Sequence, residues 1–258
     1  MVNEIKRLEN YSVLAEIYDN VMSDVDYVTW TDYIDEIILA HNPEAQEVLE
    51  LACGTGTMAL SLEELDCYNI TATDASPHMI RMAREKAEQV NSRIHFQTMN
   101  FLNLKLAQTF DVIYMVFDSL NYLHNEHDII QLHDQVRQVM NPGAIFIYDF
   151  TTPRNSRSAL RYLNKKQMKV NNSFRYRRNS SFNPEKKIHT NSFYIERTDR
   201  KTGEVLETFH EEHYQKIYTL REIEKVINKT DFAILEAYDG FELKPAHSKS
   251  LRITMVLQ

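Results

Sequence analysis

The chain has 258 residues, of which 43% are hydrophobic and 26% are charged, so it can bury a sizeable core and does not have the composition of a disordered protein. Its net charge of −8 is an average over two unlike parts, because residues 154–201 hold 14 basic and 3 acidic residues, whereas the remainder holds 15 basic and 34 acidic ones. This distribution excludes a uniformly basic nucleic-acid-binding protein and indicates a basic segment that faces an anion.

Three features concern the compartment. The first residues are charged and lack an apolar signal segment, and the longest apolar stretch, residues 112–117, is far below the roughly 20 residues that a membrane span needs. The two cysteines, Cys53 and Cys67, do not form a C-x-x-C pair and are typical of free thiols in a reducing environment. We therefore expect a cytoplasmic protein that does not associate with a membrane.

Apolar residues at helical spacing mark the start of the chain. The pattern covers residues 11–40, where Leu14, Ile17 and Val21 recur on one face, and it ends where a proline follows. We expect residues 1–45 to form a helical lid.

Strands and helices alternate over the next hundred residues and again at the end of the chain. Strands are predicted over residues 48–51, 70–74, 94–96, 112–117, 144–148, 232–238 and 251–257. Helices are predicted over residues 58–65, 77–90, 128–140 and 219–228. The pattern predicts one α/β domain, formed by residues 46–152 and 219–258, with a doubly wound, mostly parallel sheet of seven strands.

Alternation of period two replaces the helical pattern between these two segments. Three strands are predicted, over residues 172–182, 187–198 and 204–218, with turn clusters between them. Residues 153–218 are therefore expected to form a small antiparallel insert that serves as a substrate lid or as a dimer contact.

A strand that runs into a glycine turn and then a helix carries the main chemical signal. Gly54 and Gly56 allow a ligand to approach the backbone, and the helix that follows offers free N–H groups. Asp74 ends the second strand, 18 residues beyond Gly56, where a carboxylate can bind both ribose hydroxyls. The motif thus indicates a cofactor that contains a nucleoside.

The same turn also satisfies the dinucleotide pattern G-x-G-x-x-A, so an NAD-dependent oxidoreductase is an alternative. Glu50 argues against it, because a carboxylate four residues before Gly54 would repel a pyrophosphate. A carboxylate there suits a cationic ligand, such as an α-amino group or a sulfonium, which favours S-adenosylmethionine.

The segment from Leu49 to Gly56, with the sequence LELACGTG, resembles the first motif of class I S-adenosylmethionine-dependent methyltransferases. The resemblance extends over nearly the whole chain and implies a Rossmann-like fold, with Asp74 at the ribose, Met79 against the adenine and Asn100-Phe101 at the adenine edge. The cofactor residues that it implies are Tyr18, Glu50, Leu51, Ala52, Gly54, Thr55, Gly56, Asp74, Ala75, Met79, Asn100, Phe101, Phe117, Asp118 and Tyr122. Ala52 departs from the usual glycine and Asn100 from the commoner aspartate.

Two further stretches, around Tyr11 to Trp30 and around Glu211 to Tyr218, are similar to a bacterial subgroup that methylates small molecules, and sugar-amine N-methyltransferases and glycine/sarcosine-type enzymes share the general layout. Trp30 in the first of these stretches, Tyr122 after the fourth strand and His213 on one face of the insert are the residues that we expect to contact the acceptor. Asp118 follows the fourth strand, where open α/β sheets bind ligands, and is a candidate catalytic residue. His213 could act as the base or make only a structural hydrogen bond.

We therefore predict an enzyme that transfers a methyl group to nitrogen or oxygen of a small acceptor, which the basic insert suggests is anionic. No metal site is expected, because H-E-x-x-H is absent and His210 and His213 would point to opposite faces of a strand. A methyltransferase-fold protein that modifies or binds RNA through its basic insert remains an alternative, although the Asn/Asp-Pro-Pro-aromatic signature of base-modifying enzymes is absent. A homodimer is compatible with the sequence.

Overall fold

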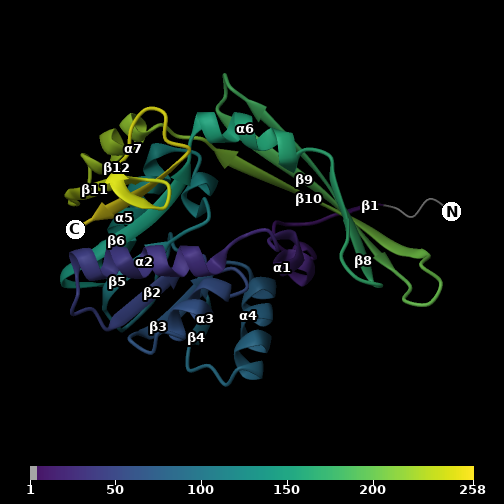
Figure 1. The fold of residues 1–258 in the computed structure, drawn as a ribbon, viewed down its shortest axis with the longest axis horizontal. Helices are drawn as coiled ribbons and strands as arrows, with labels where there is room; N and C mark the ends of the chain where they lie inside the picture. The colour runs from purple at the N-terminus through teal and green to yellow at the C-terminus, as the bar shows by residue number, and fades with distance from the viewer. Residues whose placement is uncertain (1–4) are drawn as a thin grey trace.

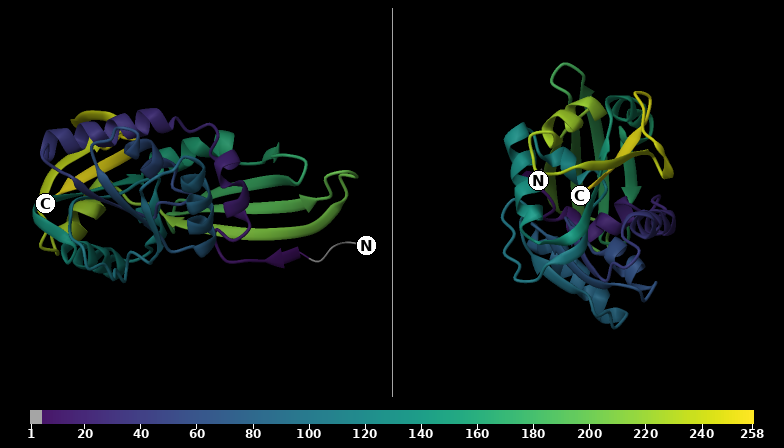
Figure 2. Two further views of the ribbon diagram at one scale, coloured as in Figure 1. Left: turned by 90° about the horizontal axis from the view of Figure 1, so that it is seen from below. Right: turned by 90° about the vertical axis from the view of Figure 1, so that its left-hand side faces the viewer.

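In the computed structural model, which describes residues 5–258, the strands form two separate sheets (Figure 1). The larger sheet has eight strands in the order β12-β11-β13-β6-β5-β2-β3-β4, and the smaller has five in the order β1-β10-β9-β8-β7. The smaller sheet extends away from the larger one, as Figure 2 shows. Residues 1–4, the beginning of the predicted lid over residues 1–45, lie outside the described part of the chain.

The strands of the larger sheet all lie within residues 46–152 and 219–258. They are β2 (Glu47–Leu51), β3 (Asn69–Asp74), β4 (His95–Thr98), β5 (Phe110–Met115), β6 (Met140–Thr151), β11 (Ile234–Asp239), β12 (Glu242–Pro245) and β13 (Arg252–Leu257). Strands β2 to β6 pair in parallel, whereas β13 runs antiparallel to β6 and to β11. The predicted doubly wound, mostly parallel fold is therefore confirmed.

Helices cover both faces of this sheet because its central strands are apolar on both sides. In β2, Val48 faces a core with α2 (Tyr27–His41), α3 (Thr57–Glu63) and α4 (Pro77–Gln89), whereas Leu49 faces a second core with α5 (Glu126–Arg137) and α7 (Leu220–Ile227). Ser76 caps α4 ahead of a proline, as the sequence predicts.

The insert contains the three predicted strands, β8 (Phe174–Asn183), β9 (Ile188–Thr198) and β10 (Val205–Lys216). Sequence alternation did not identify the edge strands β1 (Ile5–Arg7) and β7 (Lys166–Lys169), or helix α6 (Pro153–Leu163), which joins the insert to β6. Both edge strands are short and largely exposed, so they carry no apolar alternation and depend on pairing with a neighbour.

Three other details differ from the prediction. The larger sheet has eight strands rather than seven, because the short, exposed β12 forms a hairpin with β11. The helical start is divided into the 3₁₀ helix η1 (Leu14–Ile17), the short α1 (Tyr18–Val21) and α2. Strand β5 ends at Met115 instead of Phe117, since Phe117 and Asp118 have left-handed φ angles of 61° and 63°; the 3₁₀ helix η2 (Ser119–Tyr122) follows.

The N-terminal segment packs against the insert. Leu14 and Ile17 form an apolar cluster with Phe174, Ile195 and other side chains of the insert sheet. The insert is thus fixed over one edge of the α/β domain by residues that precede the glycine turn. No helix within residues 5–258 is both long enough and apolar enough to cross a membrane.

Candidate active site

The turn between β2 and α3 requires unusual backbone conformations. Ala52, Gly54 and Gly56 have φ angles of 53°, 55° and 75°. A Cβ atom on Gly56 would lie 2.6 Å from the ring of Phe96, closer than atoms can pack, so glycine is needed there for space as well as for conformation. The turn therefore holds its backbone open at the carboxyl end of the sheet, where this fold binds ligands.

Two carboxylates flank the turn. Glu50 is 2% exposed, and its Oε2 has no hydrogen-bond partner in the described chain. Burial raises the pKa of Glu50 to about 8, because the carboxylate loses its hydration. An orphaned carboxylate oxygen of this kind fits a cationic ligand group.

Asp74, in contrast to Glu50, accepts a backbone hydrogen bond on each of its carboxylate oxygens. Its Oδ2 accepts a hydrogen bond from the Gly54 N–H at 2.9 Å, and its Oδ1 accepts one from the Ser76 N–H at 2.8 Å. Burial raises the pKa of Asp74, and these two backbone donors oppose the rise. The carboxylate is thereby fixed at the end of β3, beside the glycine turn.

These groups surround a cavity of about 510 Å³, here called the first cavity. Of the predicted cofactor residues it is lined by Tyr18, Glu50, Ala52, Gly54, Thr55, Asp74, Ala75, Met79, Asn100, Phe101, Phe117 and Tyr122. Three others lie elsewhere: Leu51 is buried in the core, Gly56 packs on Phe96, and Asp118 lines another cavity. The Oδ1 of Asn100 accepts a hydrogen bond from the Leu102 N–H at 2.8 Å, so this oxygen already closes a turn.

A second cavity of about 550 Å³ lies between the α/β domain and the insert. Four aromatic side chains line both cavities: Tyr11, Tyr18, Phe117 and Tyr122. Trp30, Asp118 and His213 line the second cavity, so the structure brings the predicted acceptor residues together with Tyr122. The two cavities are thus neighbours that share an aromatic wall.

Asp118 is engaged in an ion pair. Its carboxylate binds Arg252, with Oδ1 2.8 Å from Nη1, and Arg252 also contacts the fully buried Asp149. The Asp118 N–H donates to Asp149 at 3.2 Å. A carboxylate held in this way positions the loop after β5 and is poorly placed to act as a free base.

His213 lies at the end of a chain of polar contacts. Its Nδ1 is 3.0 Å from the Tyr122 hydroxyl, which in turn lies 2.5 Å from the Tyr11 hydroxyl. Its Nε2 has no hydrogen-bond partner in residues 5–258, and Oε2 of the buried Glu211 is 3.6 Å away. Glu211 also accepts hydrogen bonds from the backbone N–H groups of Tyr11 and Leu14, at 2.7 and 2.9 Å.

Sequence reasoning missed several polar residues of the second cavity, among them Ser156, Arg178, His189 and Asn191. A signal was present, because period-two alternation from Tyr176 assigns Arg178 to the buried face of β8. That alternation does not show which part of the buried face covers a cavity.

Comparisons with known proteins agree with this geometry. A family model described as "Methyltransferase domain" matches residues 48–143. The chain is 26% identical over 224 residues to YqeM, a candidate methyltransferase of Bacillus subtilis (strain 168), and the match covers 87% of each protein. An S-adenosylmethionine-dependent methyltransferase structure from Clostridium acetobutylicum ATCC 824 superposes with a TM-score of 0.77 at 26% identity, covering 96% of this chain and 98% of that one.

The fold is also shared with a more distant structure. CalS10, an amino pentose methyltransferase from Micromonospora echinaspora solved with S-adenosylmethionine bound, superposes with a TM-score of 0.66 at 14% identity, covering 95% of this chain and 96% of that one. The fold, the first cavity and the matches together define a class I S-adenosylmethionine-dependent methyltransferase. Residues 48–143 carry the match to the methyltransferase-domain model, and the cofactor of this class is S-adenosylmethionine.

Proposed function

We propose that the enzyme methylates nitrogen or oxygen of a small molecule that binds in the second cavity. The observation that carries this proposal is the aromatic wall of Tyr11, Tyr18, Phe117 and Tyr122, which lines both cavities and would bring donor and acceptor together. The volume of the second cavity, about 550 Å³, lies in the range that small-molecule sites occupy. The amino pentose acceptor of CalS10 is in keeping with this size class.

We assign the residues of the first cavity to the parts of the cofactor by their chemistry. The orphaned carboxylate of Glu50 would bind the amino group of the methionine part, and Asp74 would bind the ribose hydroxyls. Met79 and Phe101 line the same cavity and would pack on the adenine. When bound, S-adenosylmethionine supplies a methyl group that its sulfonium charge already activates, so the protein mainly aligns the reactants and excludes water.

His213 is the residue that we propose to take the proton of the acceptor. It lines the second cavity, and its Nδ1 is hydrogen-bonded to the Tyr122 hydroxyl. This hydroxyl would relay the proton from the acceptor to His213. Glu211, 3.6 Å from Nε2, would stabilise the positive charge that His213 gains. Burial raises the pKa of Tyr122, so its phenol stays neutral and serves as a relay instead of a base.

The two alternative functions are less well supported by the charges. Lys166, Lys187 and Arg197 of the insert pair with Asp24, Glu222 and Glu16 outside it, so part of the basic charge is neutralised within the molecule rather than left for RNA. For NAD, the buried Glu50 stands where a pyrophosphate would approach. With its two cysteines unpaired, we also propose that the protein works in the cytoplasm.

Isothermal titration calorimetry tests the cofactor assignment. Wild-type protein is expected to bind S-adenosylhomocysteine, and Asp74→Ala to weaken binding by about 100-fold, since a charged hydrogen-bond acceptor is lost. Asp134→Ala, an exposed carboxylate on α5, is the matched control and should bind normally. Absence of binding in the wild type, or saturable binding of NADH in its place, would reject the proposal.

A further inference from the structure

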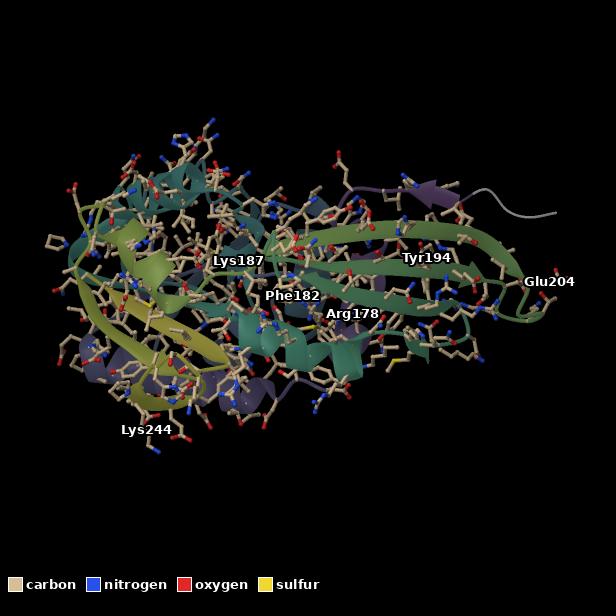
Figure 3. All side chains as sticks on the ribbon, turned by 90° about the horizontal axis from the view of Figure 1, so that it is seen from above. Arg178, Phe182, Lys187, Tyr194, Glu204 and Lys244 are labelled. Atoms are coloured by element: carbon tan, nitrogen blue, oxygen red, sulfur yellow. The ribbon has the colours of Figure 1, made fainter. Side chains whose placement is uncertain are left out.

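The buried face of the insert sheet presents one cation to the second cavity. Arg178 lies on β8 and lines this cavity, and Figure 3 shows it near the base of the insert, far from Glu204 at its tip. Its Nε and Nη2 donate to the side-chain oxygen of Asn191 at 3.1 and 2.9 Å. These bonds use Nε and one proton of Nη2, whereas Nη1 and the second proton of Nη2 have no hydrogen-bond acceptor among residues 5–258.

The charge of Arg178 is not neutralised by the protein. The other arginine of the cavity, Arg252, pairs with Asp118 and Asp149, whereas Arg178 has no carboxylate within 4.0 Å among the described residues. The ring of Phe193 lies 5.2 Å from the guanidinium carbon, and the hydroxyl groups of Tyr122 and Tyr176 are close enough to interact with its charge. A largely buried cation that has only neutral partners is costly unless a ligand supplies the counter-charge.

Other polar atoms that line the same cavity also lack partners. Ser156 Oγ, His189 Nε2 and His213 Nε2 are all inaccessible to water and unbonded in the described chain, and their residues are at most 4% exposed. Burial and the nearby charge of Arg178 lower the pKa of His189, which keeps its ring neutral. The cavity therefore offers one cation and several neutral hydrogen-bonding groups.

We propose that Arg178 binds a carboxylate of the methyl acceptor, so that the substrate is a small carboxylic acid with a nucleophilic nitrogen or oxygen. This inference rests on the proposed use of the second cavity for the acceptor. A carboxylate matches the free, planar edge of the guanidinium group with two parallel hydrogen bonds and carries one negative charge. A phosphate dianion would leave one charge uncompensated, since the second arginine is already paired.

The only tryptophan of the chain makes the site measurable. Trp30 lines the second cavity, where its ring lies 4.5 Å from Phe117 and 4.6 Å from Phe241. Its fluorescence therefore reports on this cavity. Three probes that share a cyclohexane ring are titrated in the presence of S-adenosylhomocysteine: cyclohexanecarboxylate, cyclohexanecarboxamide and cyclohexyl phosphate. None of them absorbs light at the wavelengths that excite tryptophan.

We expect cyclohexanecarboxylate to bind at least about tenfold more tightly than its amide, and more tightly than the phosphate. Arg178→Gln should remove the preference, and Arg178→Lys should keep only part of it, because a lysine lacks the planar fork. Arg177→Gln is the matched control: it removes the same charge from the neighbouring, exposed position of β8 and should preserve the preference.

Several results would overturn the inference. These are equal binding of carboxylate and amide, a preference that survives in Arg178→Gln, tighter binding of the phosphate, or no binding of any probe by protein that binds S-adenosylhomocysteine. Calorimetry with S-adenosylhomocysteine on each variant shows that the variant is folded. Failure of the wild type to bind S-adenosylhomocysteine would instead count against the proposed function as a whole.

Discussion

In the first cavity, Asp74 is bound to the glycine turn by backbone groups close to it in sequence, whereas the second cavity is built from side chains that lie far apart. Gly54, Asp74 and Ser76 are joined by hydrogen bonds within 23 residues of chain. The second cavity combines Trp30 of α2 with Arg178 and His213 of the insert. The first arrangement suits a cofactor common to a large class, and the second can change with each acceptor while the cofactor site stays intact.

The largest effect is expected at the glycine turn. Gly56→Ala should lower the free energy of unfolding by about 3 kcal/mol, since the new Cβ clashes with Phe96 and the φ angle of 75° is unfavourable for alanine. Urea denaturation measures this. The control is Gly203→Ala, which has a similar φ of 72° but no atom within 4 Å, and should cost about 1 kcal/mol. Equal losses in both variants would show that packing against Phe96 does not matter.

The next effect separates chemistry from cofactor binding. His213→Ala should lower kcat by about 100-fold if His213 takes the proton of the acceptor. Initial rates of S-adenosylhomocysteine formation between pH 6 and 9 test this, and the cofactor affinity should stay within twofold of the wild type. A turnover that is unchanged over that pH range would leave His213 with a structural role only.

A smaller effect concerns protons in the first cavity. The pKa of Glu50 is raised from 4.5 to about 8, so its contribution to stability is present below pH 4.5 and is lost as the pH rises through 8 in ligand-free protein. Pairing with the cofactor's amino group requires the ionised form, so binding at pH 7 should release about one proton. Calorimetry in two buffers of different ionisation enthalpy measures this number.

Glu50→Gln is the matched variant for that measurement. It should release no proton at this position and should bind S-adenosylhomocysteine about tenfold more weakly, since a neutral amide replaces the carboxylate. The same proton release in wild type and variant would mean that another group titrates and that Glu50 does not pair with the cofactor.

The smallest effect is expected from Asp118→Asn. Asp149 continues to neutralise Arg252, so the free energy of unfolding should fall by only about 1 kcal/mol and cofactor binding should be preserved. Chemical denaturation with calorimetry checks both. A large loss of kcat without a loss of stability would instead restore Asp118 as a catalytic candidate.

The contrast between the cavities also explains how far the sequence can predict this protein. The strand, glycine turn and Asp74 are local signals, because their spacing alone brings them together at the carboxyl end of a parallel sheet. Strands β1 and β12 could not be predicted in the same way, since they are short and exposed and form only where a partner strand already exists.

The acceptor side depends on tertiary structure. Alternation can place Arg178 on the buried face of β8, but part of that face packs on Leu14 and Ile17 while another part faces the cavity. The division depends on how the insert sits on the N-terminal segment, which no local pattern specifies. Likewise, the pairing of Asp118 with Arg252 joins residues 134 positions apart.

The shared aromatic side chains have a kinetic consequence. Because Tyr11, Tyr18, Phe117 and Tyr122 line both cavities, an acceptor bound as we propose would meet the donor at a common boundary while each occupied a volume of its own. We expect such an arrangement to require a ternary complex of enzyme, donor and acceptor. The methyl group would then be transferred directly from donor to acceptor, without a methylated enzyme intermediate. We would then expect S-adenosylhomocysteine to compete with the donor alone, so that a high concentration of acceptor would not relieve inhibition by the product.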